Sequence, residues 1–274
     1  MNHNLKLELH EKVITKLFDI NSELIIFDIG ACEGLSSVRY LSIFENAKGF
    51  AFEPLPNNYK QVLENKVKNK LDNLHAFELG LSSKKGEATF YVSSGKPPNK
   101  DKPTDNSTDF GNKSSSLYKP GKTKEVHPWL EFKESITIET ETLENFCKSH
   151  KINSIDFIHM DVQGAELLVL EGASTFINNI KSLWLEVEKI ELYEEQALKS
   201  DIEKFLTKHN FICILNKVNH IAGDQFWVQK SYFDSLNENV QKDLKNIKSK
   251  TELKSKASSF VGNLKMSLKK VIKS

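Results

Sequence analysis

The sequence predicts an α/β fold, with a largely parallel sheet covered by helices on both faces. Short apolar runs of strand length alternate along the chain with segments whose apolar residues recur at helical spacing. The apolar runs hold few polar residues, which is typical of parallel strands buried on both sides. With 274 residues, the chain is long enough for one such domain and an added segment.

Residues 1–21 are expected to form an N-terminal amphipathic helix, because Leu9, Val13 and Leu17 recur at helical spacing. The elements expected in the first half are strand 24–29, helix 35–44, strand 49–52, helix 57–67, strand 74–79 and a short extra strand at 88–92. In the second half they are helix 143–150, strand 155–160, helix 166–177, strand 183–187 and helix 200–208. Strands 211–215 and 225–228 are expected to close the sheet as an antiparallel hairpin.

Residues 93–128 interrupt this alternation within the domain, which we expect to span residues 22–230. The segment holds five of the seven prolines, together with many Ser, Asn, Lys and Thr residues. A loop of this length inside a compact domain is either functional or without fixed structure. Because it follows the third strand, we expect a mobile lid at the rim of an active site, and a solvated insertion is the alternative.

The chain ends in a lysine-rich segment, residues 231–274. From residue 235 onward, ten lysines stand against three acidic residues, whereas the rest of the chain is acidic. Phe260, Leu264 and Leu268 belong to one apolar stripe among these lysines. We expect a basic amphipathic helix, which would either bind peripherally to an anionic membrane or dock on its own domain.

The composition argues against several classes of protein. Arg39 is the sole arginine, so the bidentate contacts that read guanine are almost absent, and sequence-specific nucleic-acid binding is not expected. The three cysteines, Cys32, Cys147 and Cys213, form neither a disulfide framework nor a zinc motif. The apolar runs are too short for a signal sequence or a membrane span. We therefore expect a cytoplasmic protein, which the tail would place at the inner face of the membrane.

The segment after the first strand predicts a ligand-binding turn. An apolar strand runs into Asp28-x-Gly30-x-x-x-Gly34 and then into a helix. Glycine is needed at such a turn where a ligand lies against the backbone. A dinucleotide-binding fingerprint would require glycine at positions 32 and 35, which are Cys and Leu, so a nicotinamide cofactor is disfavoured.

A carboxylate follows the second strand. Glu53 stands 23 residues after Gly30, at the end of strand 49–52. At about 20 residues' separation, such a carboxylate accepts hydrogen bonds from ribose hydroxyls in related α/β folds. Leu81 lies after the third strand, where the nucleoside base is expected. The sequence therefore predicts a site for a ligand that carries a ribose.

Three further motifs resemble those of one known family. They are residues 154–166 (SIDFIHMDVQGAE) with Leu-Glu-Gly at 170–172, Phe-Glu-Pro at 52–54 with Tyr59, and Ser-Ser-Ser-Leu at 114–117. This combination resembles FkbM-type methyltransferases across about residues 22–230. The resemblance implies a Rossmann-like class I fold with a seven-stranded sheet, S-adenosyl-L-methionine as methyl donor, and O-methylation of sugars or secondary metabolites. The donor contacts expected with it are Asp28, Gly30, Ala31, Gly34, Glu53, Pro54 and Leu81.

The same motifs supply candidate catalytic groups. An acceptor hydroxyl becomes a good nucleophile when a nearby group accepts its proton. Asp161 is the first candidate for base or metal ligand, and Glu166 the second, although an acid there also suits its helix N-terminus. His159 shares the face of Asp161 on the strand, and we expect a buried structural role for it.

Further polar residues are expected near the acceptor. Glu186 and Glu188 end the next strand and would bind substrate hydroxyls, or Glu186 would join Asp161 at a divalent metal such as Mg²⁺. Ser115 and Ser116 would line the acceptor pocket. The preferred function is thus O-methylation of a hydroxyl on a sugar, glycan or secondary metabolite. A catalytically inactive protein that binds S-adenosylmethionine or serves as a scaffold is the alternative.

Overall fold

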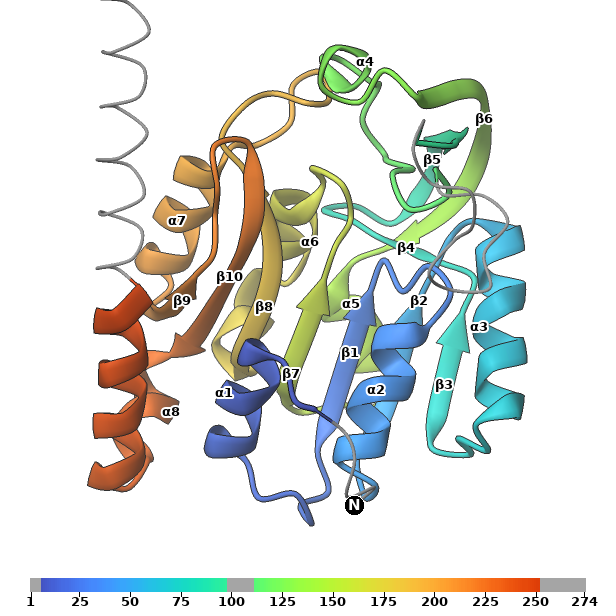
Figure 1. Ribbon diagram of the computed structural model, residues 1–274. Coiled ribbons are helices and arrows are strands. Elements are labelled where there is room, and N and C mark those ends of the chain that lie inside the picture. The colour runs from blue at the N-terminus through green and yellow to red at the C-terminus, as the bar shows by residue number, and fades with distance from the viewer. Residues whose placement is uncertain (1–5, 98–110, 252–274) are drawn as a thin grey trace, which may run out of the picture.

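A seven-stranded sheet forms the centre of the protein in the computed structural model, which describes residues 6–97 and 111–251 (Figure 1). The strands lie in the order β3-β2-β1-β7-β8-β10-β9. Their bounds are β1 Ile25–Ile29, β2 Lys48–Phe52, β3 Leu74–Phe77, β7 Ile155–Met160, β8 Ile180–Glu188, β9 Phe211–Asn216 and β10 Ala222–Gln229. β10 is antiparallel to β8 and β9, and the other neighbouring strands are parallel. The predicted fold, with its closing hairpin, is confirmed.

Helices cover both faces of this sheet. One face packs against α1 (Leu9–Leu17), α2 (Leu35–Ile43) and α3 (Pro56–Lys68). The other packs against α5 (Leu143–Ser149), α6 (Glu166–Gly172), the 3₁₀ helix η1 (Ser174–Asn179) and α7 (Lys199–Lys208). Because side chains alternate along a strand, Phe27 and Ile29 face α5 and α6, whereas Ile26 and Asp28 face α1 and α2.

One predicted helix is divided in two. Residues 166–177 were expected to be continuous, but α6 ends at Gly172 and a 3₁₀ helix begins at Ser174, whose φ is +46°. A Cβ atom on Gly172 would lie 2.1 Å from the carbonyl oxygen of Ser82, so the α6 backbone packs directly on the segment after β4 (Gly80–Leu81). Close packing at this point fixes α6 against the chain that leaves the third strand.

A second sheet, of three strands, was not predicted. Its order is β4-β6-β5, with β5 at Gly86–Gly95 and β6 at Leu130–Glu141. Only residues 88–92 were expected to be extended there, and β6 was missed. Figure 1 shows β5, β6 and the short helix α4 (Thr123–Val126) beyond the carboxyl ends of the main strands.

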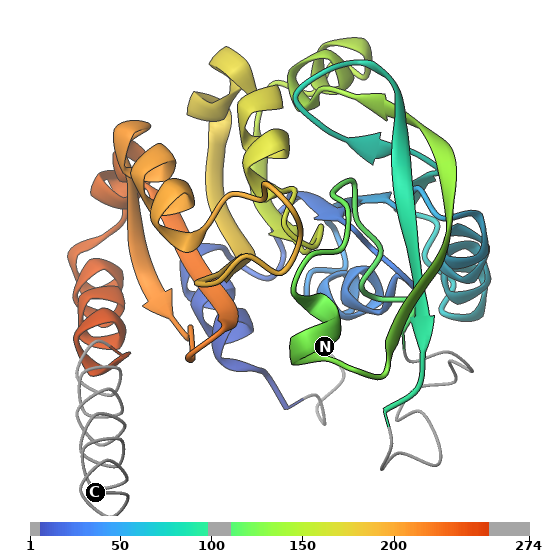
Figure 2. The same ribbon diagram turned by 90° about the horizontal axis from the view of Figure 1, so that it is seen from above.

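The predicted insertion at 93–128 begins within β5. After the undescribed residues 98–110, the chain packs between β5 and the main sheet, as Figure 2 shows from above. Ser116 pairs with Tyr91 as an isolated bridge, and Pro120 pairs with Tyr193. The segment 111–121 is therefore part of the packed structure over the main sheet, and its movement as a lid stays a prediction.

The C-terminal part folds back on the domain as far as it is described. After α8 (Lys230–Ser235), a helix runs from residue 238 to 251, and its Leu244 is fully buried against the α1 side of the sheet. Asp243 forms an ion pair with Lys16 of α1. The apolar stripe through Phe260 lies outside the described residues. Within residues 6–97 and 111–251, no helix is both long and apolar enough to cross a membrane.

Replacing Leu244 with alanine is expected to lower the free energy of unfolding by about 2–4 kcal/mol, because it leaves a cavity in the core. Urea denaturation followed by circular dichroism measures this. Val240→Ala, at a partly buried position on the same helix, serves as the control and should cost less. A loss below about 1 kcal/mol for Leu244→Ala would show that this helix is not docked in solution.

Candidate active site

The turn after β1 lies at the carboxyl ends of β1, β2 and β7, the edge where open α/β sheets bind ligands. Gly30 has a φ of +80°, and a Cβ atom there would lie 1.9 Å from the carbonyl oxygen of Asp161. The N–H groups of Gly30 and Ala31 both donate to the Phe52 carbonyl, at 3.0 Å. Gly34, with a φ of +75°, ends the turn and starts α2. Glycine at position 30 thus allows the backbone of the turn to pack directly against the ends of β2 and β7.

Glu53 follows β2 beside this turn and is buried. Its Oε2 accepts a hydrogen bond from the Cys32 N–H at 2.7 Å, and its Oε1 accepts one from the Leu55 N–H at 2.8 Å. Burial raises the pKa of Glu53 to about 8, although both N–H donors favour the carboxylate. Two backbone groups therefore fix the orientation of a carboxyl group that lines a pocket.

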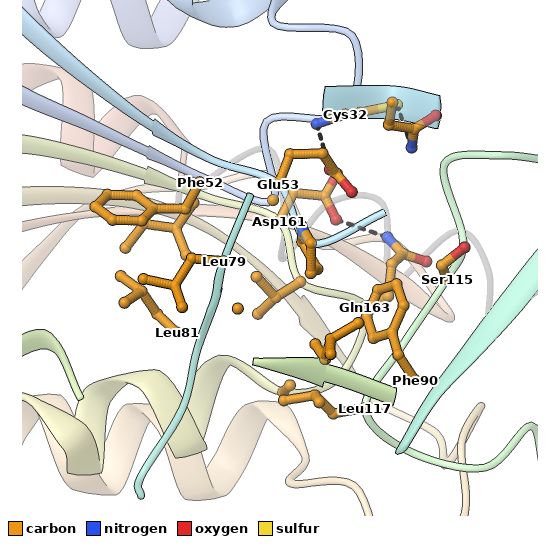
Figure 3. Close-up of a pocket in the computed structure, with 18 of the residues that line it drawn as sticks. Cys32, Phe52, Glu53, Leu79, Leu81, Phe90, Ser115, Leu117, Asp161 and Gln163 are labelled. Carbon is orange, nitrogen blue, oxygen red and sulfur yellow. Dashed lines mark hydrogen bonds between the residues drawn. The ribbon is translucent and has the colours of Figure 1, made fainter. Parts of the chain in front are cut away.

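This pocket, which we call the Glu53 pocket, has an empty volume of about 550 Å³ (Figure 3). Its apolar wall comes from both sheets and consists of Phe52, Leu79, Leu81, Phe90, Leu117 and Ile138. Its polar side carries Glu53, Asp161 and Gln163, which face one another in Figure 3. An apolar slot beside a fixed carboxyl group suits a nucleoside, whose base is flat and whose ribose donates hydrogen bonds.

Two asparagines complete the polar side and were not found from the sequence. The Asn112 Nδ2 donates to Glu33 Oε1 at 3.1 Å and to Asn58 Oδ1 at 3.2 Å. Among the described residues, nothing donates to the buried Oδ1 of Asn112. Asn112 lies far from Asn58 in sequence, in a segment rich in Asn, Ser and Lys, so no local pattern marks it. The segment after residue 110 thus forms a wall of the Glu53 pocket.

The two predicted serines have different surroundings. Ser115 lines the Glu53 pocket, and its Oγ accepts a hydrogen bond from the Ser93 N–H at 3.0 Å. Ser116 is fully buried, where its Oγ donates to the Gln163 carbonyl at 2.7 Å and accepts from the Tyr118 N–H. Ser116 therefore holds the segment in place and presents no hydroxyl to an acceptor.

A second pocket lies on the other side of the turn. This His159 pocket has an empty volume of about 520 Å³ and is lined by Gly30, Ala31, Cys32, Glu33, Leu35, Ser36, Lys113, His159 and Asp161. Four of these residues, Gly30, Cys32, Lys113 and Asp161, also line the Glu53 pocket. The two pockets therefore meet at this turn and offer adjoining space to one elongated ligand.

Asp28 and His159 are direct neighbours across β1 and β7. The Asp28 Oδ1 lies 2.9 Å from His159 Nδ1, and Asp28 Oδ2 accepts from the Ser37 hydroxyl at 2.5 Å. Burial disfavours the charged imidazole, but the hydrogen bond and charge of Asp28 outweigh it and raise the pKa of His159. Asp28 lines neither pocket and contacts His159 instead, so its predicted contact with the donor stays a prediction.

Two residues beyond His159, Asp161 follows the end of β7, and on the next strands Glu186 of β8 pairs with Asp224 of β10, so these three acids form a row along the edge of the sheet. The Gln163 Nε2 donates to Asp161 Oδ1 at 2.6 Å and to Glu186 Oε2 at 2.9 Å. The charge of Asp161, together with burial, raises the pKa of Glu186 to about 10. Gln163, which the sequence did not single out, therefore bridges acids that would otherwise repel each other.

Glu166 on α6 and Glu188 at the end of β8 are the two remaining predicted acids, and each is 2% exposed. Glu166 is buried, and its Oε1 accepts from the Val162 N–H at 2.9 Å, which fixes the turn before α6. Burial, followed by the charge of Asp161, raises the pKa of Glu188 to about 7. Neither residue lines the Glu53 or the His159 pocket. The placement of Glu166 favours a structural role, and Glu188 is too deeply buried to meet a substrate directly.

The described part of the chain holds no group of three or more His, Cys, Asp or Glu side chains arranged to bind a metal. Asp161 and Glu186, which were expected to join at Mg²⁺, are instead bridged by the Gln163 amide. Among the described residues, an amide thus stands between the two acids where the metal ion was expected, and the metal site stays a prediction.

The model of the "Methyltransferase FkbM domain" matches residues 28–213. The chain belongs to the FkbM methyltransferase family. It is also 30% identical over 190 residues to the 2-O-methyltransferase NoeI of Sinorhizobium fredii (strain NBRC 101917 / NGR234), across 69% of this chain and 73% of that protein.

Solved structures with a similar chain path have low sequence identity. M. capricolum TrmK in complex with S-adenosyl-homocysteine matches with a TM-score of 0.43 and 12% identity, over 85% of this chain and 73% of that chain. A protein of the NADB-Rossmann superfamily from Streptococcus agalactiae matches with a TM-score of 0.47 and 12% identity, over 97% and 88% of the two chains.

As a member of this family, the protein is an S-adenosylmethionine-dependent methyltransferase. Its residues fit that donor. Glu53 offers a fixed carboxyl group for the ribose, and the buried Asn112 Oδ1 offers an acceptor that nothing described satisfies. Of the predicted donor contacts, Gly30, Ala31, Glu53, Pro54 and Leu81 line one or both pockets, whereas Gly34 supports the turn and packs near Val62.

Proposed function

We propose that this FkbM methyltransferase methylates a sugar hydroxyl, with the donor lying across the turn at Gly30. Its adenosine would occupy the Glu53 pocket, and its methionine end the His159 pocket. The observation that carries this proposal is the shared lining of the two pockets: Glu53 lines one, His159 lines the other, and Asp161 lines both. The name 2-O-methyltransferase of the similar protein supports transfer to oxygen.

The protein's part in such a reaction is mainly to hold donor and acceptor in line. When bound, the donor supplies an electrophilic methyl group on a positively charged sulfur. Asp161 lines both pockets and stands where they meet, so its carboxylate would face that positive charge. Glu186 and Asp224 line neither pocket but are partly exposed beside Asp161, and there they would accept hydrogen bonds from the hydroxyls of a sugar.

The test is transfer of a tritiated methyl group from S-adenosylmethionine to a panel of p-nitrophenyl glycosides. The control is p-nitrophenol, the same aglycone without a sugar. We expect a methyl ether on one hydroxyl, identified by mass spectrometry and NMR. Binding of S-adenosylhomocysteine without transfer to any sugar or to a metabolite panel would favour the inactive alternative. Transfer to an amine or thiol with no transfer to hydroxyls would contradict the proposal.

The affinity for S-adenosylhomocysteine is expected to rise with pH and to level off near pH 8. Because the pKa of Glu53 is about 8, the free protein carries this carboxyl group protonated at lower pH. Ribose hydroxyls donate to the ionised form, so binding releases a proton and improves as pH rises, by up to about tenfold per unit. Calorimetry at several pH values measures this. An affinity that does not depend on pH, or a rise that persists in Glu53→Gln, would contradict it.

We also propose that the lysine-rich tail holds the enzyme at the anionic inner face of the membrane in the cytoplasm. Ten lysines against three acids from residue 235 onward support this. Since Leu244 is part of the core, the matched comparison is the full chain against one ending at Thr251. The full chain should co-sediment with phosphatidylglycerol vesicles and not with phosphatidylcholine vesicles. Equal sedimentation of both chains with phosphatidylglycerol would contradict the proposal.

A further inference from the structure

His159 is held by its neighbours, and its side chain, which is 18% exposed, lines a pocket. Its Nδ1 is paired with Asp28, and the Tyr40 ring meets its edge at a centroid distance of 5.6 Å. Trp184 is its neighbour on β8. No described residue forms a hydrogen bond with Nε2, and the ring lines the His159 pocket beside Asp161 and Gly30. An imidazole fixed at one nitrogen by a buried carboxylate presents the other nitrogen in a defined direction.

Asp28 is itself held in place from two sides. It is 2% exposed, and each of its oxygens has a partner, Ser37 on α2 and His159 on β7. A buried carboxylate in this position favours the Nδ1–H form of the ring and leaves Nε2 able to accept a proton. The pair therefore has the arrangement of a general base and the residue that orients it.

We propose that His159 is the general base for methyl transfer and that Asp28 is its positioning residue. This inference rests on the proposed function. The acceptor oxygen forms a bond to the methyl carbon while the carbon–sulfur bond breaks, and that electron pair stays on sulfur, which gives S-adenosylhomocysteine. The hydroxyl proton passes to Nε2 of His159, and the imidazolium is stabilised by Asp28.

This assignment changes the role expected for Asp161. The Asp161 Oδ1 accepts a hydrogen bond from Gln163 at 2.6 Å and belongs to the row of acids. Such a carboxylate is placed to face the sulfonium and to orient the acceptor. The charged and titratable groups that face His159 are Asp28 from β1, Tyr40 from α2, Asp224 from β10, His10 from α1, Asp161, and Lys113 across the pocket.

The first test needs no acceptor and shows, through the pKa of His159, whether this ring lies beside the reacting methyl group. The protein is labelled with ¹⁵N-histidine, and the signal of His159 among the eight histidines is identified by its absence in His159→Gln. The pKa of His159 is then measured with S-adenosylmethionine bound and with S-adenosylhomocysteine bound. The two ligands differ by the methyl group and its positive charge. A sulfonium beside the ring should lower this pKa by about one unit or more.

The second test is turnover on the acceptor identified among the glycosides. His159→Gln should lower kcat by about 100-fold or more, with the affinity for S-adenosylhomocysteine unchanged within about threefold. Asp28→Asn should lower both kcat and the pKa of His159, because it keeps the hydrogen bond and removes the charge. His220→Gln, at an exposed turn, is the control and should match the wild type.

The outcomes separate this inference from the proposed function. Binding of both ligands with the same His159 pKa would overturn the inference alone, because the ring would then lie away from the sulfonium. Full turnover by His159→Gln would overturn it as well. If neither ligand binds, the proposed function falls together with the inference. The inference is established if the pKa of His159 is lower with S-adenosylmethionine bound than with S-adenosylhomocysteine, and if turnover is lost in the His159 and Asp28 variants but not in the control.

Discussion

Replacing Gly30 with alanine is expected to lower both the stability of the protein and its affinity for the donor, because the added methyl group has no room. A Cβ atom would lie 1.9 Å from the Asp161 carbonyl oxygen, which is backbone and cannot rotate away. The φ of +80° adds about 1–2 kcal/mol of strain for a residue with a side chain. The end of β7 would have to move, and with it Asp161, which lines both pockets.

We expect Gly30→Ala to lower the free energy of unfolding by about 3 kcal/mol and to weaken binding of S-adenosylhomocysteine by more than about 100-fold. Urea denaturation and calorimetry measure the two effects. Gly86→Ala is the matched control, since Gly86 also has positive φ but nothing within 4 Å of its would-be Cβ. If both variants lose the same stability and the same affinity, close packing at the turn is not what the site needs.

Replacing Glu53 with glutamine is expected to weaken binding of S-adenosylhomocysteine by about 30- to 300-fold, the loss of one or two hydrogen bonds to a charged acceptor. The amide keeps the shape of the side chain, but its NH₂ group would face either the Cys32 N–H or the Leu55 N–H, and both are donors. The ribose would then meet a group that is poorly oriented and uncharged.

Glu78→Gln is the control for this variant, because Glu78 is an exposed acid after β3, the neighbouring strand. It should bind S-adenosylhomocysteine as the wild type does. Glu53→Gln should also lose the rise of affinity with pH. Wild-type affinity in Glu53→Gln would mean that the adenosine lies elsewhere, whatever the stability of the variant.

The main sheet and the turn at its edge could be predicted because their signals are local. Each parallel strand is a short apolar run, and Gly30 and Glu53 stand directly after two of them. The carboxyl ends of neighbouring parallel strands meet at one edge of the sheet. A residue that directly follows such a strand in the sequence is therefore expected at the site. The same rule placed Asp161 correctly at the pocket lining.

The second sheet could not be predicted with the same ease. β6 carries alternating Ile136, Ile138 and Thr140, but half of its residues are exposed and many are charged. Its partners are β5, more than 30 residues earlier, and the two-residue β4. The proline-rich composition between them predicted a loop, although residues 111–121 pack over the main sheet.

The direction of Asp28 and the contacts of Asn112 depend on register and on chain paths that no local pattern gives. Asp28 was expected at the donor because it opens the glycine turn. Strand alternation instead turns it toward α2, where the register of β1 and β7 sets it opposite His159. That pairing depends on both strands together, and it favours His159 over Asp161 as the base that we propose.

A crystal structure of the protein with S-adenosylhomocysteine tests the proposed donor site most directly. We expect the ribose hydroxyls within about 2.5–3.2 Å of the Glu53 carboxylate and the adenine against Leu81 and Phe90. The sulfur should lie where the two pockets meet, facing Asp161 and His159. A ligand with its adenine outside the Glu53 pocket, or with its sulfur turned away from both residues, would contradict the account.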